Sequence, residues 1–270
     1  MKILFVVIVG ALIFGTFFFA FAFPNHEATE TWKFPPVGRK IFLNVSVGSL
    51  NILPGNSSSI YVVVVQSGNG FLASFARLKF SASFANGTLD ITESISPRNL
   101  WPSQVQILVY LPLGGFVAIN VLKQTGNVYV HYTSLDDLFV KVRTGDVGVY
   151  LPSGREITVE VNAGSVYLAL ASSGAVNIST GTGAVTFRAH TLGCAPVTIN
   201  TITGRIIFNT SAMQSFRLNA STVNGQIVLG GGRTDYSTVY QAPNSVSISS
   251  GSGCADVEIG SVDGSIYVQA

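Results

Sequence analysis

The stretch KVRTGDVGVYLPSG, residues 141–154, contains one copy of a short motif that recurs through the second half of the chain. The motif, G-x-[VI]-x-[VLIF], places apolar side chains two and four positions after a glycine. Five successive intervals between these glycines are 19, 19, 19, 21 and 21 residues, and Asn244 takes the glycine's place in one further copy. Such regular intervals indicate a structural repeat. The motif glycines are Gly126, Gly145, Gly164, Gly183, Gly204, Gly225 and Gly264.

The alternation within the motif predicts its secondary structure. Residues two positions apart on a strand share one face, and the position two after the glycine is β-branched in every copy. A second apolar segment follows each glycine by about 12–16 residues, as in the alternating ITVEV of residues 157–161. We therefore expect two short strands per repeat, each stacked in parallel on its equivalents. The sequence predicts an all-β fold, a β-solenoid with coils of about 19–21 residues.

The glycines predict a turn at the entrance to each strand. We expect a positive φ or a close approach of neighbouring turns at these positions, because both exclude a Cβ. Asn244 is compatible with this role, since asparagine visits left-handed geometry more readily than most residues.

The N-terminal 23 residues differ in composition from the rest. After Met1 and the basic Lys2 come 21 uncharged, mostly apolar residues, 3–23, a length that favours an uncleaved signal anchor. Residues 20–22, AFA, also offer a signal-peptidase site. We therefore expect an N-terminal hydrophobic helix and a single-pass membrane protein with its C-terminal domain outside the cell. Secretion after cleavage near Ala22 is the alternative.

The remainder divides into three segments. Residues 24–40 are polar and contain proline, which is typical of a stalk. Residues 41–125 contain strand-like segments and are predicted to continue the regular solenoid of residues 126–270. Only 10% of the residues are charged and the net charge is +2, so the composition argues against a nucleic-acid partner. An exported chain also makes N-glycosylation relevant. The sequons lie at Asn44, Asn56, Asn86, Asn177, Asn209 and Asn219.

The chain resembles the adhesin-like domains of unknown function known as DUF4097 and head-GIN domains. The resemblance rests on the hexads TGNVYV, TGDVGV, AGSVYL and TGAVTF, on NGTLDI, and on the strand VQILVYLP, and it covers residues 41–268. It implies a single-stranded right-handed parallel β-helix on a cell surface, with some relatives associated with envelope stress sensing. It implies no catalytic residue.

Motifs for ligand chemistry are weak in this sequence. The Walker phosphate loop does not occur, and a calcium-binding solenoid would need an aspartate in every repeat, where only Asp146 follows a motif glycine. Asp137 and Glu156 are 19 residues apart and would approach on adjacent coils, as a glycosidase pair might require. Lys141 and Glu160 have the same spacing, which favours cross-coil ion pairs instead. No metal site or cofactor is predicted.

Two further features yield expectations about the surface. Tyr129, Tyr167 and Tyr267 fall in one outward column, as a stabilising ladder or a glycan-binding stripe. Cys194 and Cys254 fall near one edge but three coils apart, about 14 Å by strand spacing, so we expect no disulfide between them unless residues 229–244 distort the stack.

Together these features predict a non-enzymatic, adhesin-like scaffold at the cell surface. Its expected partners are the membrane, through the N-terminal segment, and a surface protein, a glycan or another copy of itself. Self-association would use the solenoid ends, because the last coil at residues 264–268 is expected to be uncapped. An envelope-stress sensor and a polysaccharide-acting enzyme are the alternatives.

Overall fold

The structure, a computed structural model, describes residues 26–35, 40–68, 77–85, 88–96, 104–113, 118–133, 135–210, 215–230, 237–250 and 254–269. Within these ranges the chain forms 21 strands and no helix, which confirms the all-β prediction for the described residues. None of these ranges holds a helix of the length and apolarity that a bilayer span needs. The predicted anchor or signal peptide, residues 1–23, lies outside them.

The strands form two ladders that share the long strands β11 and β12. The order in the first ladder is β1 (His26–Phe34), β4 (Ile60–Gly68), β7 (Gln104–Pro112), β3 (Ser49–Gly55), β9 (Val128–His131), β11 (Val147–Ala163), β12 (Val166–Thr182), β13 (Val185–Leu192), β15 (Ile206–Thr210), β21 (Ile266–Gln269) and β17 (Ile227–Gly230).

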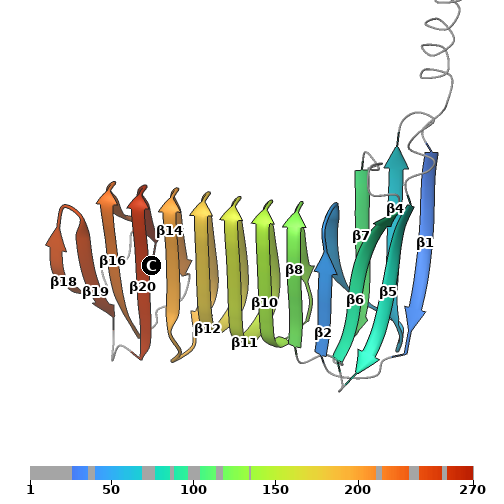
Figure 1. Cartoon of the computed structure of the whole chain (residues 1–270). Helices are drawn as coiled ribbons and strands as arrows, with labels where there is room; N and C mark the ends of the chain where they lie inside the picture. The colour runs from blue at the N-terminus through green and yellow to red at the C-terminus, as the bar shows by residue number, and fades with distance from the viewer. Residues whose placement is uncertain are drawn as a thin grey trace, which may run out of the picture.

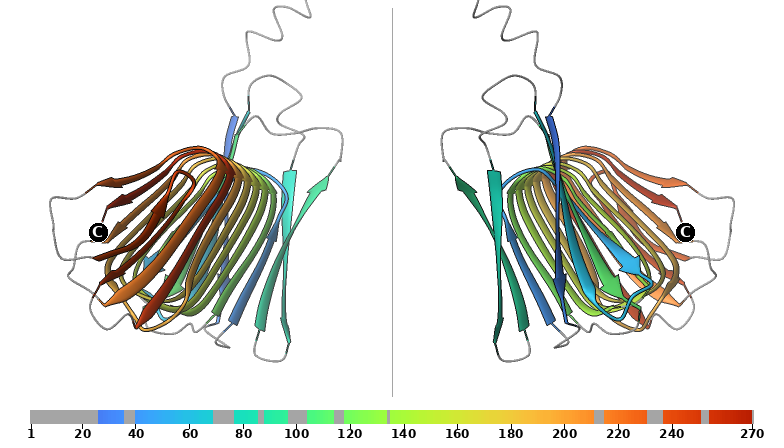
Figure 2. Two further views of the ribbon diagram at one scale, coloured as in Figure 1. Left: turned by 90° about the vertical axis from the view of Figure 1, so that its left-hand side faces the viewer. Right: turned by 90° about the vertical axis from the view of Figure 1, so that its right-hand side faces the viewer.

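The second ladder faces the viewer in Figure 1. Its order is β5 (Arg77–Ala85), β6 (Thr88–Ser96), β2 (Lys40–Val45), β8 (Ala118–Thr125), β10 (Leu135–Thr144), β11, β12, β14 (Val197–Thr203), β20 (Ala255–Asp263), β16 (Phe216–Asn224), β19 (Ser245–Ser250) and β18 (Ser237–Ala242). The end-on views in Figure 2 show the chain passing from one ladder to the other around a common interior.

The repeat appears directly in the pairing register. Val147 of β11 pairs in parallel with Val166 of β12, and Val166 pairs with Val185 of β13, so equivalent positions of successive repeats are neighbours. The side chains two and four residues after the glycines point into the interior, and those of Val128 to Ile206 in the first set are at most 1% exposed. Phe187 and Phe208 stack with ring centroids 5.3 Å apart. The predicted period-two alternation therefore defines the core.

The motif glycines line one corner between the two ladders, here called the glycine corner (Gly48, Gly126, Gly145, Gly164, Gly183, Gly204, Gly264 and Gly225). Gly164 has φ +144°, and a Cβ there would collide with the carbonyl oxygen of Gly145 in the preceding repeat. Backbones approach this closely only where the side chain is a hydrogen atom. Gly164 thus has both of the features predicted for the motif glycines, a positive φ and a close approach of the neighbouring turn.

Buried hydroxyl groups donate hydrogen bonds within the glycine corner. Sequence inspection did not identify these hydroxyl groups. Three residues before a glycine, Thr180 donates a hydrogen bond of 3.2 Å to the carbonyl of Gly164, and Thr222 donates one of 3.0 Å to the carbonyl of Gly264. Both threonines are at most 5% exposed. These hydroxyls satisfy glycine carbonyls that face the interior, where an unpaired polar group would be costly.

The order of strands in space differs from their order in the chain at both ends of the array. The C-terminal strands β20 and β21 lie between β14/β15 and β16/β17 instead of at the end. The expectation that the last coil, residues 264–268, forms an uncapped end is therefore wrong. In the same way β2 and β3 pair with β8 and β9, so Gly48 and Gly126, 78 residues apart, are neighbours.

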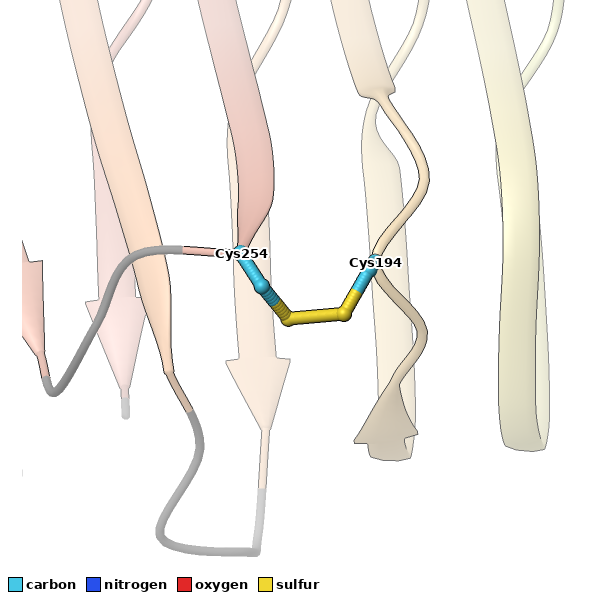
Figure 3. Close-up of a disulfide and its surroundings, with 2 residues drawn as sticks. All are labelled: Cys194 and Cys254. Carbon is cyan, nitrogen blue, oxygen red and sulfur yellow. A yellow bond between two sulfur atoms is a disulfide. The ribbon is translucent and has the colours of Figure 1, made fainter.

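The inserted position of β20 produces a disulfide that the sequence argument excluded. Cys194 lies three residues before Val197 of β14, Cys254 lies three residues before Val257 of β20, and these two valines are paired. The cysteines are therefore directly opposite, with their Cα atoms 4.9 Å apart, and form a disulfide (Figure 3). The prediction of no bridge is wrong because it assumed that coils stack in chain order.

The assignment of Asn244 to the repeat is also wrong. The segment that it introduces, β19, runs antiparallel to β16 and forms a hairpin with β18 at the end of the second ladder. Pro243 and Asn244 occupy the turn of this hairpin. Proline followed by asparagine is a favourable pair for the central positions of a β-turn, which is the local signal that the repeat alignment overlooked.

The N-terminal end of the array is likewise closed by antiparallel strands. β4 pairs antiparallel with β7, and β1 pairs antiparallel with β4 over all nine of its residues, from His26↔Gly68 to Phe34↔Ile60. Most of the segment predicted as a stalk, residues 24–40, is therefore an edge strand whose Trp32 and Phe34 pack on the core. The alternation of polar and aromatic residues in TETWKF is the reason.

Candidate functional site

The outward side of the first ladder concentrates tyrosines. We call it the tyrosine face, and its tyrosines are Tyr61, Tyr110, Tyr129, Tyr150, Tyr167 and Tyr267. The chain contains nine tyrosines in all, so most of them lie on this one surface. Strand alternation places them there, because each flanks an inward-facing residue such as Val130 or Val149.

Two parallel rows of side chains run across the strands of this face. The first row contains Tyr129, Gly148, Tyr167, Thr186, Ile207 and Tyr267 as successive register partners. This is the predicted tyrosine column, with Ile207 as an additional member because β21 pairs with β15. The second row contains Tyr61 and Tyr110 at one end, followed further along by His131, Tyr150, Ala169 and Arg188.

The most exposed part of the face is a cluster around Tyr150. Tyr129 and Tyr150 are 39% and 46% exposed, far above the core aromatics. The ring of Tyr150 lies 5.2 Å from that of Tyr167 and 6.3 Å from that of His131, measured between centroids. A Cβ on Gly148 would lie 2.8 Å from the Tyr129 ring, so this ring covers the glycine. The cluster is a shallow, nearly continuous aromatic surface.

Cations flank the tyrosines. The guanidinium groups of Arg188 and Arg205 lie 5.7 Å from the rings of Tyr167 and Tyr267, and the Lys33 ammonium lies 5.6 Å from the ring of Tyr61. Cations at these distances are attracted by the negative face of an aromatic ring. A hydrogen bond with Ser57 and the neighbouring Lys33 lower the pKa of Tyr61. Among the described residues the two rows contain no aspartate or glutamate, so this face is weakly cationic.

The predicted carboxylate pair does not form a catalytic arrangement. Asp137 and Glu156 are register partners on β10 and β11, as their spacing predicted. The carboxylate of Asp137, however, accepts a hydrogen bond of 3.1 Å from the Arg155 guanidinium, and this interaction raises the pKa of Arg155. The contact between Arg155 and Asp137 is a surface ion pair. Because the Asp137 carboxylate binds Arg155, it is not positioned to act on a substrate together with Glu156.

Other predicted surface groups have structural roles. Lys141 and Glu160 form the expected cross-repeat ion pair at 2.7 Å, with side chains 54% and 39% exposed. Asp146, the single aspartate that follows a motif glycine, accepts a hydrogen bond of 2.7 Å from the amide of Ser165 in the next repeat. No group of three or more His, Cys, Asp or Glu side chains suited to a metal ion occurs in the described ranges.

Most described sequons lie on the other side of the molecule. Asn44, Asn177 and Asn219 are exposed on the outer surface of the second ladder, and Asn56 is exposed beyond β3. Asn209 is half-buried on β15, where it donates a hydrogen bond of 3.0 Å to Gln269. Asn86 lies outside the described residues. Sugars on the second ladder would leave the tyrosine face uncovered.

Two buried side chains of opposite charge, Glu93 and Lys123, lie where the N-terminal strands join the array, and sequence inspection did not find them. Oε2 of Glu93 accepts hydrogen bonds from the amides of Ser46 and Val47, at 2.9 and 3.3 Å. The Lys123 ammonium donates one of 3.0 Å to the carbonyl of Val47. Burial raises the pKa of Glu93 and lowers that of Lys123 to about 8. The Val47 backbone thus bridges the two charges beside an open groove of about 550 Å³.

Comparisons with known proteins find similar structures but no similar sequence. No protein-family model and no curated protein matches the chain, so the predicted DUF4097 membership is not confirmed. A cell adhesion protein candidate from Clostridium sporogenes is 12% identical with a TM-score of 0.36, covering 91% of this chain and 99% of its own. An adhesin candidate from Bacteroides fragilis is 13% identical with a TM-score of 0.43, covering 90% and 96%. A lipid-binding protein candidate from Parabacteroides distasonis is 12% identical with a TM-score of 0.26, covering 91% and 97%. Similarity at this level assigns no function to the chain.

Proposed function

We propose that the protein is a non-enzymatic, adhesin-like scaffold at the cell surface that binds extracellular polysaccharide through its tyrosine face. The cluster of Tyr129, Tyr150 and Tyr167 is the observation that carries this proposal. Tyrosine combines a flat apolar ring, which packs on the faces of sugar rings, with a hydroxyl group that donates and accepts hydrogen bonds. Arg188 and His131 at its margin add further hydrogen-bond donors.

The geometry favours a repeating polymer over a folded protein. Tyr129 and Tyr167 lie on either side of β11, two strand spacings or about 10 Å apart along the array. An extended glycan presents equivalent sugar faces at a regular interval of this order. Protein partners generally fill concave, fully desolvated pockets at their energetic centre, whereas these rings stand on an open sheet.

The charge of the face selects among polysaccharides. With Lys33, Arg188 and Arg205 beside the rings and no carboxylate in either described row, an acidic glycan meets complementary charge. We therefore expect uronic-acid polymers to bind more tightly than neutral glucans, and the difference to shrink at high salt.

The proposed location outside the cytoplasm is supported by the N-terminal sequence and by the disulfide. A bridge between Cys194 and Cys254 is typical of an oxidising compartment. This supports export through residues 1–23, either as a retained anchor or as a signal peptide cleaved near Ala22. We further propose that the two ladders form one right-handed β-solenoid, the geometry that would present the tyrosines as a straight array.

The experiment measures binding of the full chain to polygalacturonate and to dextran by titration calorimetry. The variant Y129T/Y150T/Y167T should weaken polygalacturonate binding by about 10-fold to 100-fold, because each lost aromatic contact contributes about 0.5–1 kcal/mol. Phe139→Thr removes one outward aromatic from the opposite ladder and is the matched control, expected to bind like the parent. Equal binding by the tyrosine variant, at an unchanged content of folded protein, contradicts the proposal.

A further inference from the structure

Three adjacent aliphatic side chains project from the glycine corner near the C-terminal end of the array. Ile202, Val262 and Val223, here called the aliphatic ridge, are 61%, 48% and 63% exposed. Each lies two residues before a motif glycine, at the end of β14, β20 and β16. The pairing of β20 with both of the other strands places Val262 between Ile202 and Val223. The insertion of β20 therefore supplies Val262, the middle member of the ridge.

The fold does not require apolar residues at these positions. Their chain neighbours Thr201, Ser261 and Thr222 point inward and are at most 5% exposed, so the ridge residues point away from the core. In earlier repeats the equivalent position is Arg143 or Asn162, which are exposed and polar. A single exposed valine needs no explanation, but a contiguous group of β-branched side chains is typical of a contact surface.

The position of the ridge indicates what covers it. In Figure 1 the parallel strands of the second ladder, among them β14, β20 and β16, point towards the glycine corner, and β1 begins at that same end of the molecule. His26, the first residue of β1, is therefore on the ridge's side. In the sequence it follows an uncharged apolar segment, residues 3–23. If that segment is in a bilayer, the glycine corner faces the bilayer.

The distribution of charge agrees with this orientation. The opposite corner, where β10 begins and β11 turns, contains Asp136, Asp137 and Glu156 against the single cation Arg155. The glycine corner carries no such excess of acidic groups, since the exposed Asp146 and Asp263 beside its glycines are matched by the exposed Arg143 and Arg205. An anionic lipid surface would repel the acidic corner and accept the other.

We propose that the aliphatic ridge inserts into the lipid surface, so that the array lies with its long axis along the membrane. This inference rests on the retained anchor, one of the two routes of export in the proposed function. The anchor at the β1 end and the ridge at the far end then hold the array at two points. The tyrosine face, which descends from the glycine corner, stays open to the extracellular space.

The test places tryptophan reporters in the full chain reconstituted in phosphatidylcholine vesicles, with and without brominated acyl chains. Gln226→Trp adds a reporter next to Gly225, beside the ridge, and Ala171→Trp adds one at the acidic corner; both native side chains are exposed. Brominated lipid should quench the added emission of Gln226→Trp about twofold and leave that of Ala171→Trp unchanged, after subtraction of the parent's signal. Adding I202T/V223T/V262T, which keeps β-branched residues, should abolish the quenching.

The outcomes separate the anchor from the ridge. Flotation with the vesicles reports the anchor, and a chain that does not float contradicts both the retained anchor and the ridge inference, whereas polysaccharide binding is tested separately by the calorimetry above. A chain that floats but shows no quenching of Gln226→Trp overturns the ridge inference alone. A blue shift of that emission that depends on protein concentration, without quenching by brominated lipid, also overturns it and assigns the ridge to a contact between copies of the chain.

Discussion

Substituting Gly164 with alanine tests whether the glycine corner holds the array together. Gly164 has φ +144°, a region that residues with a Cβ rarely enter, and the strain of such a conformation is about 1–3 kcal/mol. The added methyl group would also meet the carbonyl oxygen of Gly145, which belongs to the backbone and has no rotamer with which to move aside. Its displacement would strain the hydrogen bond from the Gly145 amide to Ala163, now 2.9 Å.

We therefore expect Gly164→Ala to lower the free energy of unfolding by about 3 kcal/mol, at the upper end of typical substitutions. For a chain of this size that corresponds to a fall of roughly 6–12 °C in Tm, measured by the loss of the β-sheet signal in circular dichroism. Gly230→Ala is the matched control, because the nearest atom to its Cβ is 3.7 Å away and its Tm should not change. A Tm for Gly164→Ala within about 2 °C of the parent would refute the reasoning, since it implies less than about 1 kcal/mol.

Three further predictions follow from the interior and the surface. Replacing Cys194 and Cys254 by serine opens a loop of 60 residues and should cost about 4 kcal/mol in denaturant unfolding; unchanged stability would mean that the bridge does not constrain the chain. Because the pKa of Lys123 falls from 10.5 to about 8 on folding, the unfolded state binds more protons than the folded state between these two pH values. The free energy of unfolding of the parent should therefore rise across this window relative to that of Lys123→Met. If the free energies of the two proteins change with pH in the same way, the burial of the charge is contradicted. Lys141→Ala removes only an exposed ion pair and should change the unfolding free energy by less than about 1 kcal/mol.

The sequence predicts the strands and the inward-facing positions within each repeat, but not the order in which all the repeats pair in the array. The inward positions, the all-β class and the pair of Lys141 with Glu160 follow from alternation and spacing, which are local properties of the chain. The insertion of β20 beside β14 is a choice among strands with nearly equivalent patterns, so local periodicity does not specify it. The disulfide depends on that choice, and its prediction failed for that reason.

The candidate site was predictable in part. Tyr129, Tyr167 and Tyr267 follow from the repeat register, and Tyr150 could have been placed beside them because it lies five residues after Gly145, on the same outward side. Tyr61 and Tyr110 could not, because they join the face through antiparallel pairing of β4 with β7, outside the repeat. The buried pair of Glu93 and Lys123 similarly depends on β2 lying between β6 and β8.

Binding of polysaccharide by the tyrosine face can be measured directly. Hydroxyl-radical footprinting of the full chain, with and without saturating polygalacturonate, measures it residue by residue through the oxidation rates of individual side chains. We expect bound polymer to slow the oxidation of Tyr129 and Tyr150, the two most exposed rings of the tyrosine face, and to leave that of Phe139 on the opposite ladder unchanged. Bound polymer that protects Phe139 and leaves Tyr129 and Tyr150 as reactive as before would contradict this expectation.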